Sequence, residues 1–160
     1  MISQEVTERT EIVHPLFQKA NGLTESIIGA AIEVHKDKGP GLVESIYEWC
    51  LLRELELRQL STESQRTVRI TYKGFVREDS LRFDVLVEDC VLVEAKATES
   101  ILPIHKAQLL SCMKLLDVPV GLLINFYSLW VQYPGACSGL VVAGLAEAGP
   151  GSATPATVGD

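Results

Sequence analysis

The chain has 160 residues and a mass of 17.5 kDa, which predicts a single domain with a sizeable hydrophobic core. Hydrophobic residues make up 47% and charged residues 22%, a composition that excludes an intrinsically disordered protein. The net charge of −7 argues against binding of nucleic acid through a uniformly basic surface. Residues 59–126 are nearly neutral, with eight basic and nine acidic side chains, so a local basic strip is still compatible with the sequence.

The two ends of the chain and its cysteines narrow the class of protein further. The first residues are polar and acidic, and no apolar run reaches the roughly 18 residues that a membrane helix needs. We therefore expect a cytoplasmic protein with no membrane partner. The four cysteines form no Cys-x-x-Cys pair, which excludes the common zinc and redox motifs, and each is expected to be a small core residue.

Two helices are predicted near the N-terminus, after an arm that covers residues 1–22. Apolar residues recur at helical spacing from Leu23 to Lys38. Gly39-Pro40-Gly41 then ends this helix, because proline cannot continue it and glycine accepts the conformation of a C-cap. A second helical stripe begins near Val43.

The apolar period then changes from helical to alternating. Three strands are predicted from the alternation: Thr67–Lys73, Leu81–Glu88 and Cys90–Ala97. A third helix is expected at about Ile104–Leu116 with Pro103 at its start, followed by a buried strand at Val120–Phe126. A meander of three strands, a helical crossover and a fourth strand predict an α/β (α+β) fold with a mixed sheet flanked by helices.

The domain is expected to span residues 23–134 and to be followed by a tail of low complexity. From Gly135 to Asp160, 18 of 26 residues are Gly, Ala, Ser, Thr or Pro. Leu140–Leu145 is apolar enough to dock on the domain, but its pattern predicts no defined element.

Charged residues interrupt the most apolar predicted strand. If the chain turns back at Glu88-Asp89, Asp84 lies before the turn, while Glu94 and Lys96 share one face of the returning strand. Two carboxylates and a lysine at a strand end can hold Mg²⁺ and activate a water molecule. The alternative, which the spacing alone favours, is an ordinary salt bridge of Lys96 with Asp84 or Glu94.

Three further polar residues lie on the predicted helices. Glu44 opens the second helix, where its simplest role is to interact with the helix dipole. Tyr47 follows three residues later and is by itself a candidate core aromatic. Gln108 lies on the third helix and is by itself an exposed polar residue. His35 and His105 have no partner at metal-ligand spacing.

Taken together, these segments resemble the GxxExxY family, a group of small bacterial and archaeal proteins related to the PD-(D/E)XK nuclease superfamily. The namesake motif is Gly41-Leu42-Val43-Glu44-Ser45-Ile46-Tyr47, and Asp84 with Glu94-x-Lys96 is similar to the D…(D/E)xK pattern of the superfamily. Ala107–Leu110 and Gly121–Phe126 extend the similarity. The resemblance covers about residues 23–126.

The resemblance implies a restriction-endonuclease-like core and a metal-dependent nuclease, with DNA as the first substrate to consider. It implies that Glu44, Asp84 and Glu94 face Mg²⁺ or Mn²⁺, with the Ala95 carbonyl oxygen as a further ligand. Lys96 would be the catalytic lysine, acting with Asp84 and Glu94. Gln108 would be a supporting residue of the catalytic site.

A second function remains open from the sequence. Tyr127–Asp160 contains no Lys or Arg, whereas the family usually continues there with a basic segment. This departure and the acidic balance favour a non-catalytic self-assembling or protein-interaction module that retains the nuclease fold. A homo-oligomer is expected under that hypothesis, because a small sheet exposes its edges.

Overall fold

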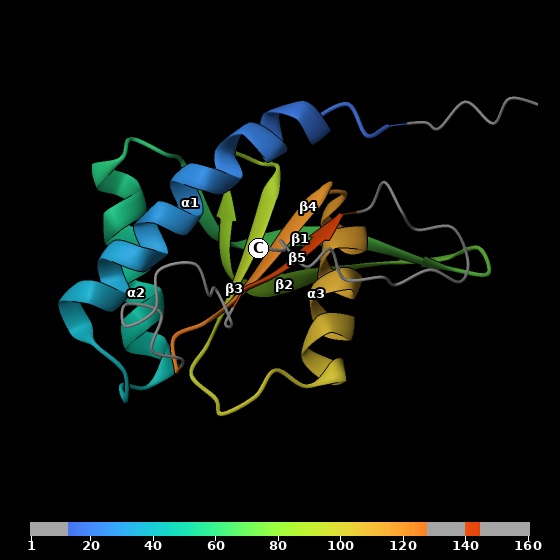
Figure 1. Ribbon diagram of the computed structural model, residues 1–160. Coiled ribbons are helices and arrows are strands. Elements are labelled where there is room, and N and C mark those ends of the chain that lie inside the picture. The colour runs from blue at the N-terminus through green and yellow to red at the C-terminus, as the bar shows by residue number, and fades with distance from the viewer. Residues whose placement is uncertain (1–12, 128–139, 145–160) are drawn as a thin grey trace, which may run out of the picture.

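The computed structural model describes residues 13–127 and 140–144, and these form three helices around one five-stranded sheet (Figure 1). In chain order the elements are α1 (Phe17–Lys38), α2 (Glu44–Leu57), β1 (Thr62–Tyr72), β2 (Phe75–Val87), β3 (Val91–Lys96), α3 (Pro103–Leu116), β4 (Val120–Asn125) and β5 (Leu140–Gly144).

The sheet is mixed and its strands follow the order of the chain, β1-β2-β3-β4-β5. The first three strands form an antiparallel meander, and α3 crosses over so that β4 pairs parallel to β3. β5 then pairs antiparallel to β4. The predicted α+β fold, a meander followed by a helical crossover and a parallel strand, is confirmed.

The helices cover both faces of the sheet, with α1 and α2 on one face and α3 on the other (Figure 1). Alternate residues of β3 pack into the cores on the two faces of the sheet, because successive side chains of a strand point to opposite faces. Val91 and Val93 pack with α1 and α2, whereas Leu92 packs with α3. β4 is buried along its whole length, as its continuous apolar run predicts for a central strand.

Helix α1 begins at Phe17, six residues before its predicted start at Leu23. The predicted arm therefore contains the first turns of a helix. Leu16 and Phe17 pack against the core formed with α2, and Ala20 is fully buried. Tertiary packing stabilises these turns even though their sequence shows little periodicity.

The first two strands are longer than their alternating patterns predict. β1 begins at Thr62 rather than Thr67, and β2 begins at Phe75 rather than Leu81. The added residues 62–66 of β1 pair with the predicted strand Leu81–Glu88, and the added residues 75–80 of β2 pair with the predicted strand Thr67–Lys73. Residues 67–80 form a distal hairpin whose faces are largely exposed, and apolar alternation marks its first strand but not residues 75–80.

Residues 140–144 form strand β5, for which the sequence predicted no element. Its backbone pairs with β4 from Ile124 opposite Leu140 to Val120 opposite Gly144. Without this partner, one edge of the buried strand β4 would keep unpaired peptide groups. The rest of the predicted tail lies outside the described residues.

The burial of the cysteines and the length and polarity of the helices can be compared with the sequence predictions. Cys50 and Cys90 are buried and Cys112 is half-buried, all as free thiols, whereas Cys137 lies outside the described residues. Within the described ranges, every helix is too short or too polar to cross a lipid bilayer.

Candidate functional site

The charged residues of the β2–β3 hairpin meet where the pairing of these two strands ends. The last paired residues are Val85 and Val93, so Asp84 and Glu94 stand next to each other one residue beyond them. Asp84 Oδ2 accepts a hydrogen bond of 2.7 Å from the backbone nitrogen of Ala95. This bond fixes the Asp84 carboxylate against the carboxyl end of β3.

Lys96 joins this hairpin to the first turn of α2. Its Nζ lies 3.7 Å from Glu94 Oε2 and 3.8 Å from Glu44 Oε2. Glu44 Oε1 also accepts a hydrogen bond of 3.3 Å from the backbone nitrogen of Ala97. The structure therefore brings together four of the predicted site residues, Glu44, Asp84, Glu94 and Lys96, from three elements.

The GxxExxY segment positions Glu44 through its glycine and its tyrosine. Gly41 has a φ of 97°, a left-handed conformation that favours glycine. Tyr47 is fully buried, and its hydroxyl donates to the Gly39 carbonyl oxygen at 2.6 Å and accepts from the Leu42 nitrogen at 3.1 Å. Tyr47 is thus a core aromatic that also holds the loop in front of Glu44.

Asn125, the last residue of β4, forms hydrogen bonds with the segment that follows β3 on the other side of the site. Its Oδ1 accepts hydrogen bonds of 3.2 Å from the nitrogens of Thr98 and Tyr127, and its Nδ2 donates to the Thr98 carbonyl oxygen at 2.7 Å. The Phe126 nitrogen donates to the Lys96 carbonyl oxygen at 2.7 Å. These bonds fix the path of the chain at Lys96.

Burial and mutual repulsion change the acidity of the carboxyl groups. The pKa of Glu94 is raised from 4.5 to about 7, chiefly by burial; the charge of Asp84 adds to the rise, and Lys96 opposes it. Burial also raises the pKa of Asp84, against the opposing effects of the Ala95 hydrogen bond and Lys96. The cluster therefore favours the uptake of a proton or another cation.

Glu48 is a fourth carboxylate of this cluster, and the sequence analysis missed it. It lies one turn after Glu44 on α2 and is half-buried. Burial raises its pKa, with further contributions from Asp84 and Glu44. The spacing of four residues from Glu44 is the signal that could have identified it, because such residues share a helix face.

Gln108 is the predicted site residue that the structure does not join to the others. It is exposed on α3, and within residues 13–127 and 140–144 it makes no hydrogen bond to the carboxylates. Cys112, one turn later on the same helix, lies near enough to Glu94 to sense its charge: burial raises the thiol pKa of Cys112, and the charge of Glu94 adds to this rise.

The oxygen donors of the cluster suit Mg²⁺ in their chemistry, since hard cations prefer carboxylate and carbonyl oxygens. In the described part of the chain, however, no three acidic, histidine or cysteine side chains are already arranged as a metal-binding group. The Lys96 ammonium lies between the Glu94 and Glu44 carboxylates and balances part of their charge.

A model of the PD-(D/E)XK nuclease superfamily matches residues 21–133, so the chain belongs to this superfamily. The mixed sheet with its helices is consistent with the restriction-endonuclease-like fold of these proteins. Nucleases of this superfamily generally use divalent metals such as Mg²⁺. The match does not distinguish the GxxExxY family, which stays a prediction. Comparisons with curated proteins and with solved structures gave no match.

Proposed function

We propose that this chain is a cytoplasmic, metal-dependent nuclease that hydrolyses phosphodiester bonds, with DNA as its first candidate substrate. The observation that carries the proposal is the meeting of Asp84, Glu94 and Lys96 at the end of β3 with Glu44 from α2. The membership of the PD-(D/E)XK nuclease superfamily supports the same reaction class.

Glu44, Asp84 and Glu94 would hold Mg²⁺ or Mn²⁺, together with the carbonyl oxygen of Ala95. When bound, such an ion stabilises the negative charge that develops on the phosphate and lowers the pKa of a bound water. Asp84 is already fixed by the Ala95 nitrogen, and Glu44 by the Ala97 nitrogen. These hydrogen bonds reduce the freedom that two of the ligands would lose on binding the ion.

Lys96 would orient the attacking water and stabilise the charge of the transition state. Its side chain is only 19% exposed, and two carboxylates hold its Nζ at the end of β3. An ammonium held in a partly buried site acts more strongly on a phosphate than one in bulk water. Gln108 would support the site from α3 once substrate is bound.

The first experiment measures cleavage of duplex and single-stranded DNA with Mg²⁺ or Mn²⁺. Lys96→Ala is expected to lower turnover at least about 100-fold, the scale of a lost charge-stabilising group. Lys114→Ala, which removes an exposed cation of α3, is the matched control and is expected to cleave normally. Equal cleavage by the parent and Lys96→Ala would exclude the proposed role of Lys96.

A titration calorimetry experiment tests the metal site separately. Saturable binding of Mg²⁺ or Mn²⁺ is expected for the parent and for Lys96→Ala, but weakened in Asp84→Ala and Glu94→Ala. Both carboxylate variants binding metal like the parent would show that the ligands are assigned wrongly.

A second candidate function is a non-catalytic module that assembles with itself or with another protein. Three exposed apolar side chains at the start of α2 favour it: Val43, the residue before the helix, is 63% exposed, and Ile46 and Trp49 on the helix are 41% and 61% exposed. Under this alternative, light scattering would give the mass of an oligomer, and Trp49→Gln would reduce it. A monomeric mass for the parent would exclude self-assembly.

A further inference from the structure

The distal part of the β1–β2 hairpin extends past α3 and away from α1 and α2 (Figure 1). We call residues 69–77 the hairpin arm. Its strands pair up to Tyr72 opposite Phe75, and Lys73 and Gly74 make the turn with φ values of 46° and 87°. This is a two-residue turn of the kind that matches the twist of a hairpin.

Side chains that a soluble domain usually buries are exposed at the end of the hairpin arm. Tyr72 is 67% exposed and Phe75 is 77% exposed, and they face each other across the two strands. Ile70 and Val76 are also exposed. Adjacent aromatic side chains at a protruding tip indicate a binding surface rather than a folding requirement.

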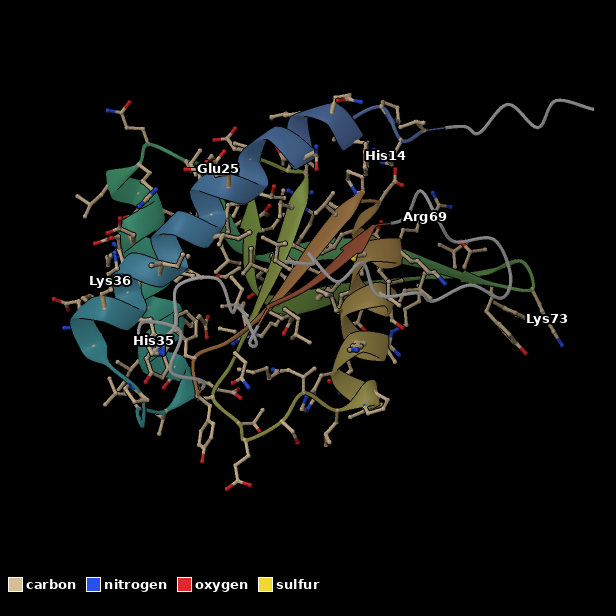
Figure 2. The ribbon with its side chains drawn as sticks, viewed as in Figure 1. His14, Glu25, His35, Lys36, Arg69 and Lys73 are labelled. Atoms are coloured by element: carbon tan, nitrogen blue, oxygen red, sulfur yellow. The ribbon has the colours of Figure 1, made fainter. Side chains whose placement is uncertain are left out.

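The hairpin arm is also positively charged in this acidic chain, although Glu78, the residue after it, lies opposite Arg69. Residues 69–77 contain Arg69, Lys73 and Arg77 and no carboxylate, whereas the whole chain has a net charge of −7. Arg77 pairs with Asp79 just outside the arm, at 2.6 Å. Within the described residues, Arg69 and Lys73 form no ion pair. Figure 2 shows both on the hairpin, far from the labelled Lys36 on α1.

Cations and aromatic rings on a two-stranded ribbon suit nucleic acid as a partner. Such a ribbon fits the major groove of B-DNA, the cations contact phosphates, and rings can stack on bases. A second copy of this chain is a poorer partner at the tips, because two positive tips would repel each other. The arm therefore complements a polyanion by charge.

The position of the arm along β2 relates it to the candidate catalytic site. Asp84 lies nine positions after Phe75 on the same strand. At about 3.3 Å per residue this is at most about 30 Å, close to the roughly 34 Å of one helical turn of DNA. A duplex at the catalytic site can thus reach the arm within about one turn.

We propose that the hairpin arm is a second DNA contact, which binds the duplex about one helical turn from the bond that is cleaved. This inference rests on the proposed nuclease function and assigns duplex DNA as the substrate class. Arg69 and Lys73 contact phosphates, and Tyr72 and Phe75 contact the groove. The arm supplies the basic surface that the chain as a whole lacks.

Fluorescence anisotropy with a labelled 24-base-pair duplex in EDTA tests the arm, because chelation of metal separates binding from cleavage. The variant is Arg69→Ala/Lys73→Ala in the full chain. The matched control is Lys36→Ala/Arg53→Ala, which removes two exposed cations from α1 and α2. All substituted residues are exposed, and circular dichroism is used to verify that both variants stay folded.

The arm variant is expected to bind at least tenfold more weakly than the parent, and the control within about twofold. Each lost phosphate contact lowers the slope of log K against log salt by about 0.9, so the arm variant is expected to lose about 1.8. Phe75→Ala is expected to weaken binding with little change in this slope.

Three results would overturn the proposal: no binding of duplex by the parent, equal loss in the arm variant and the control, or a change of molecular mass in the arm variant that reveals a protein partner. Arm-dependent binding without any cleavage on addition of Mg²⁺ or Mn²⁺ would instead contradict the proposed nuclease function and support the arm as a DNA contact.

Discussion

Tyr47 is bonded to the main chain of the loop that precedes its own helix: its hydroxyl donates a 2.6 Å hydrogen bond to the Gly39 carbonyl oxygen. The ring of Tyr47 stacks on Phe126, with centroids 4.6 Å apart and planes 5° apart. Phe126 in turn donates its backbone N–H to the carbonyl of Lys96. One side chain therefore links the loop before Glu44 to the end of β3, where Lys96 lies.

Tyr47→Phe is expected to separate the packing of this residue from its hydrogen bonds. The stacking on Phe126 remains, but the Gly39 carbonyl and the Leu42 N–H lose their shared partner. We expect the free energy of unfolding to fall by about 1–2 kcal/mol in urea titrations. The rate of DNA cleavage at saturating metal is also expected to fall, because the loop before Glu44 no longer holds this residue in position.

Tyr127→Phe is the control for this substitution, because Tyr127 is 46% exposed. It is expected to leave stability and cleavage unchanged. If Tyr47→Phe also behaved like the parent in both measurements, the hydroxyl would have no part in positioning Glu44.

Gly121 is expected to tolerate no side chain, because β4 and α3 approach each other closely there. A Cβ atom at this position would lie 2.5 Å from Met113 Sδ and 3.0 Å from Leu109 Cγ. Gly121→Ala is therefore expected to lower the free energy of unfolding by about 1–3 kcal/mol, the usual range for overpacking. Thermal or urea unfolding measures this change.

Gly22→Ala is the matched substitution in open space, because nothing lies within 4 Å of a Cβ there. Alanine has the higher helix propensity, so this variant is expected to gain about 0.5–1 kcal/mol within α1. Destabilisation by Gly22→Ala, or none by Gly121→Ala, would contradict the packing described.

The raised pKa of Glu94 predicts a pH-dependent stability. The pKa rises from 4.5 to about 7 on folding, so the folded state binds the proton more tightly than the unfolded state between these values. The stability contributed by this proton is complete below about pH 4.5 and is lost as the pH rises to about 7. The Glu94 side chain is 17% exposed, so solvent screens this effect only partly.

Glu94→Gln removes the titrating carboxyl group and with it the loss of stability between about pH 4.5 and 7. We expect the variant to be more stable than the parent by about 1–3 kcal/mol at pH 8, and similar to it at pH 4.5. Urea titrations at both pH values measure the difference, and Glu99→Gln, an exposed position, is the control. An equal change at the two pH values would show that Glu94 does not titrate differently on folding.

Addition of Mn²⁺ is expected to raise the melting temperature more at pH 8 than at pH 5.5. A bound cation relieves the repulsion among Glu44, Asp84 and Glu94, whereas at low pH protons compete for the same carboxylates. At 100 times the dissociation constant, binding to the folded state adds about 2.7 kcal/mol. Differential scanning fluorimetry measures the shift.

Asp84→Asn is expected to abolish most of the stabilisation by Mn²⁺, and Asp79→Asn, on the distal hairpin, is the control. A shift that persists in Asp84→Asn would place the cation elsewhere on the protein.

Local patterns in the sequence were sufficient to predict the hairpin that carries Asp84, Glu94 and Lys96. The side chains of a strand alternate with a period of two, and a turn at Glu88-Asp89 sets which residues pair across the hairpin. The relative positions of Asp84, Glu94 and Lys96 therefore depend on about a dozen consecutive residues. The same kind of signal predicted the order of helices and strands up to Val120–Phe126. The two helices of the GxxExxY region were likewise marked by periodicity and by Gly39-Pro40-Gly41.

Tertiary structure alone decided which distant elements meet. The contact of Glu44 with Lys96, the inclusion of Glu48 in the cluster, and the exposure of Gln108 depend on how α2 and α3 pack on the sheet. β5 and the first part of β2, residues 75–80, also escaped prediction: β5 gains its order from pairing with β4, and residues 75–80 from pairing with residues 67–72 of β1. Such pairings are set by backbone hydrogen bonds between strands, which leave no apolar period in the sequence.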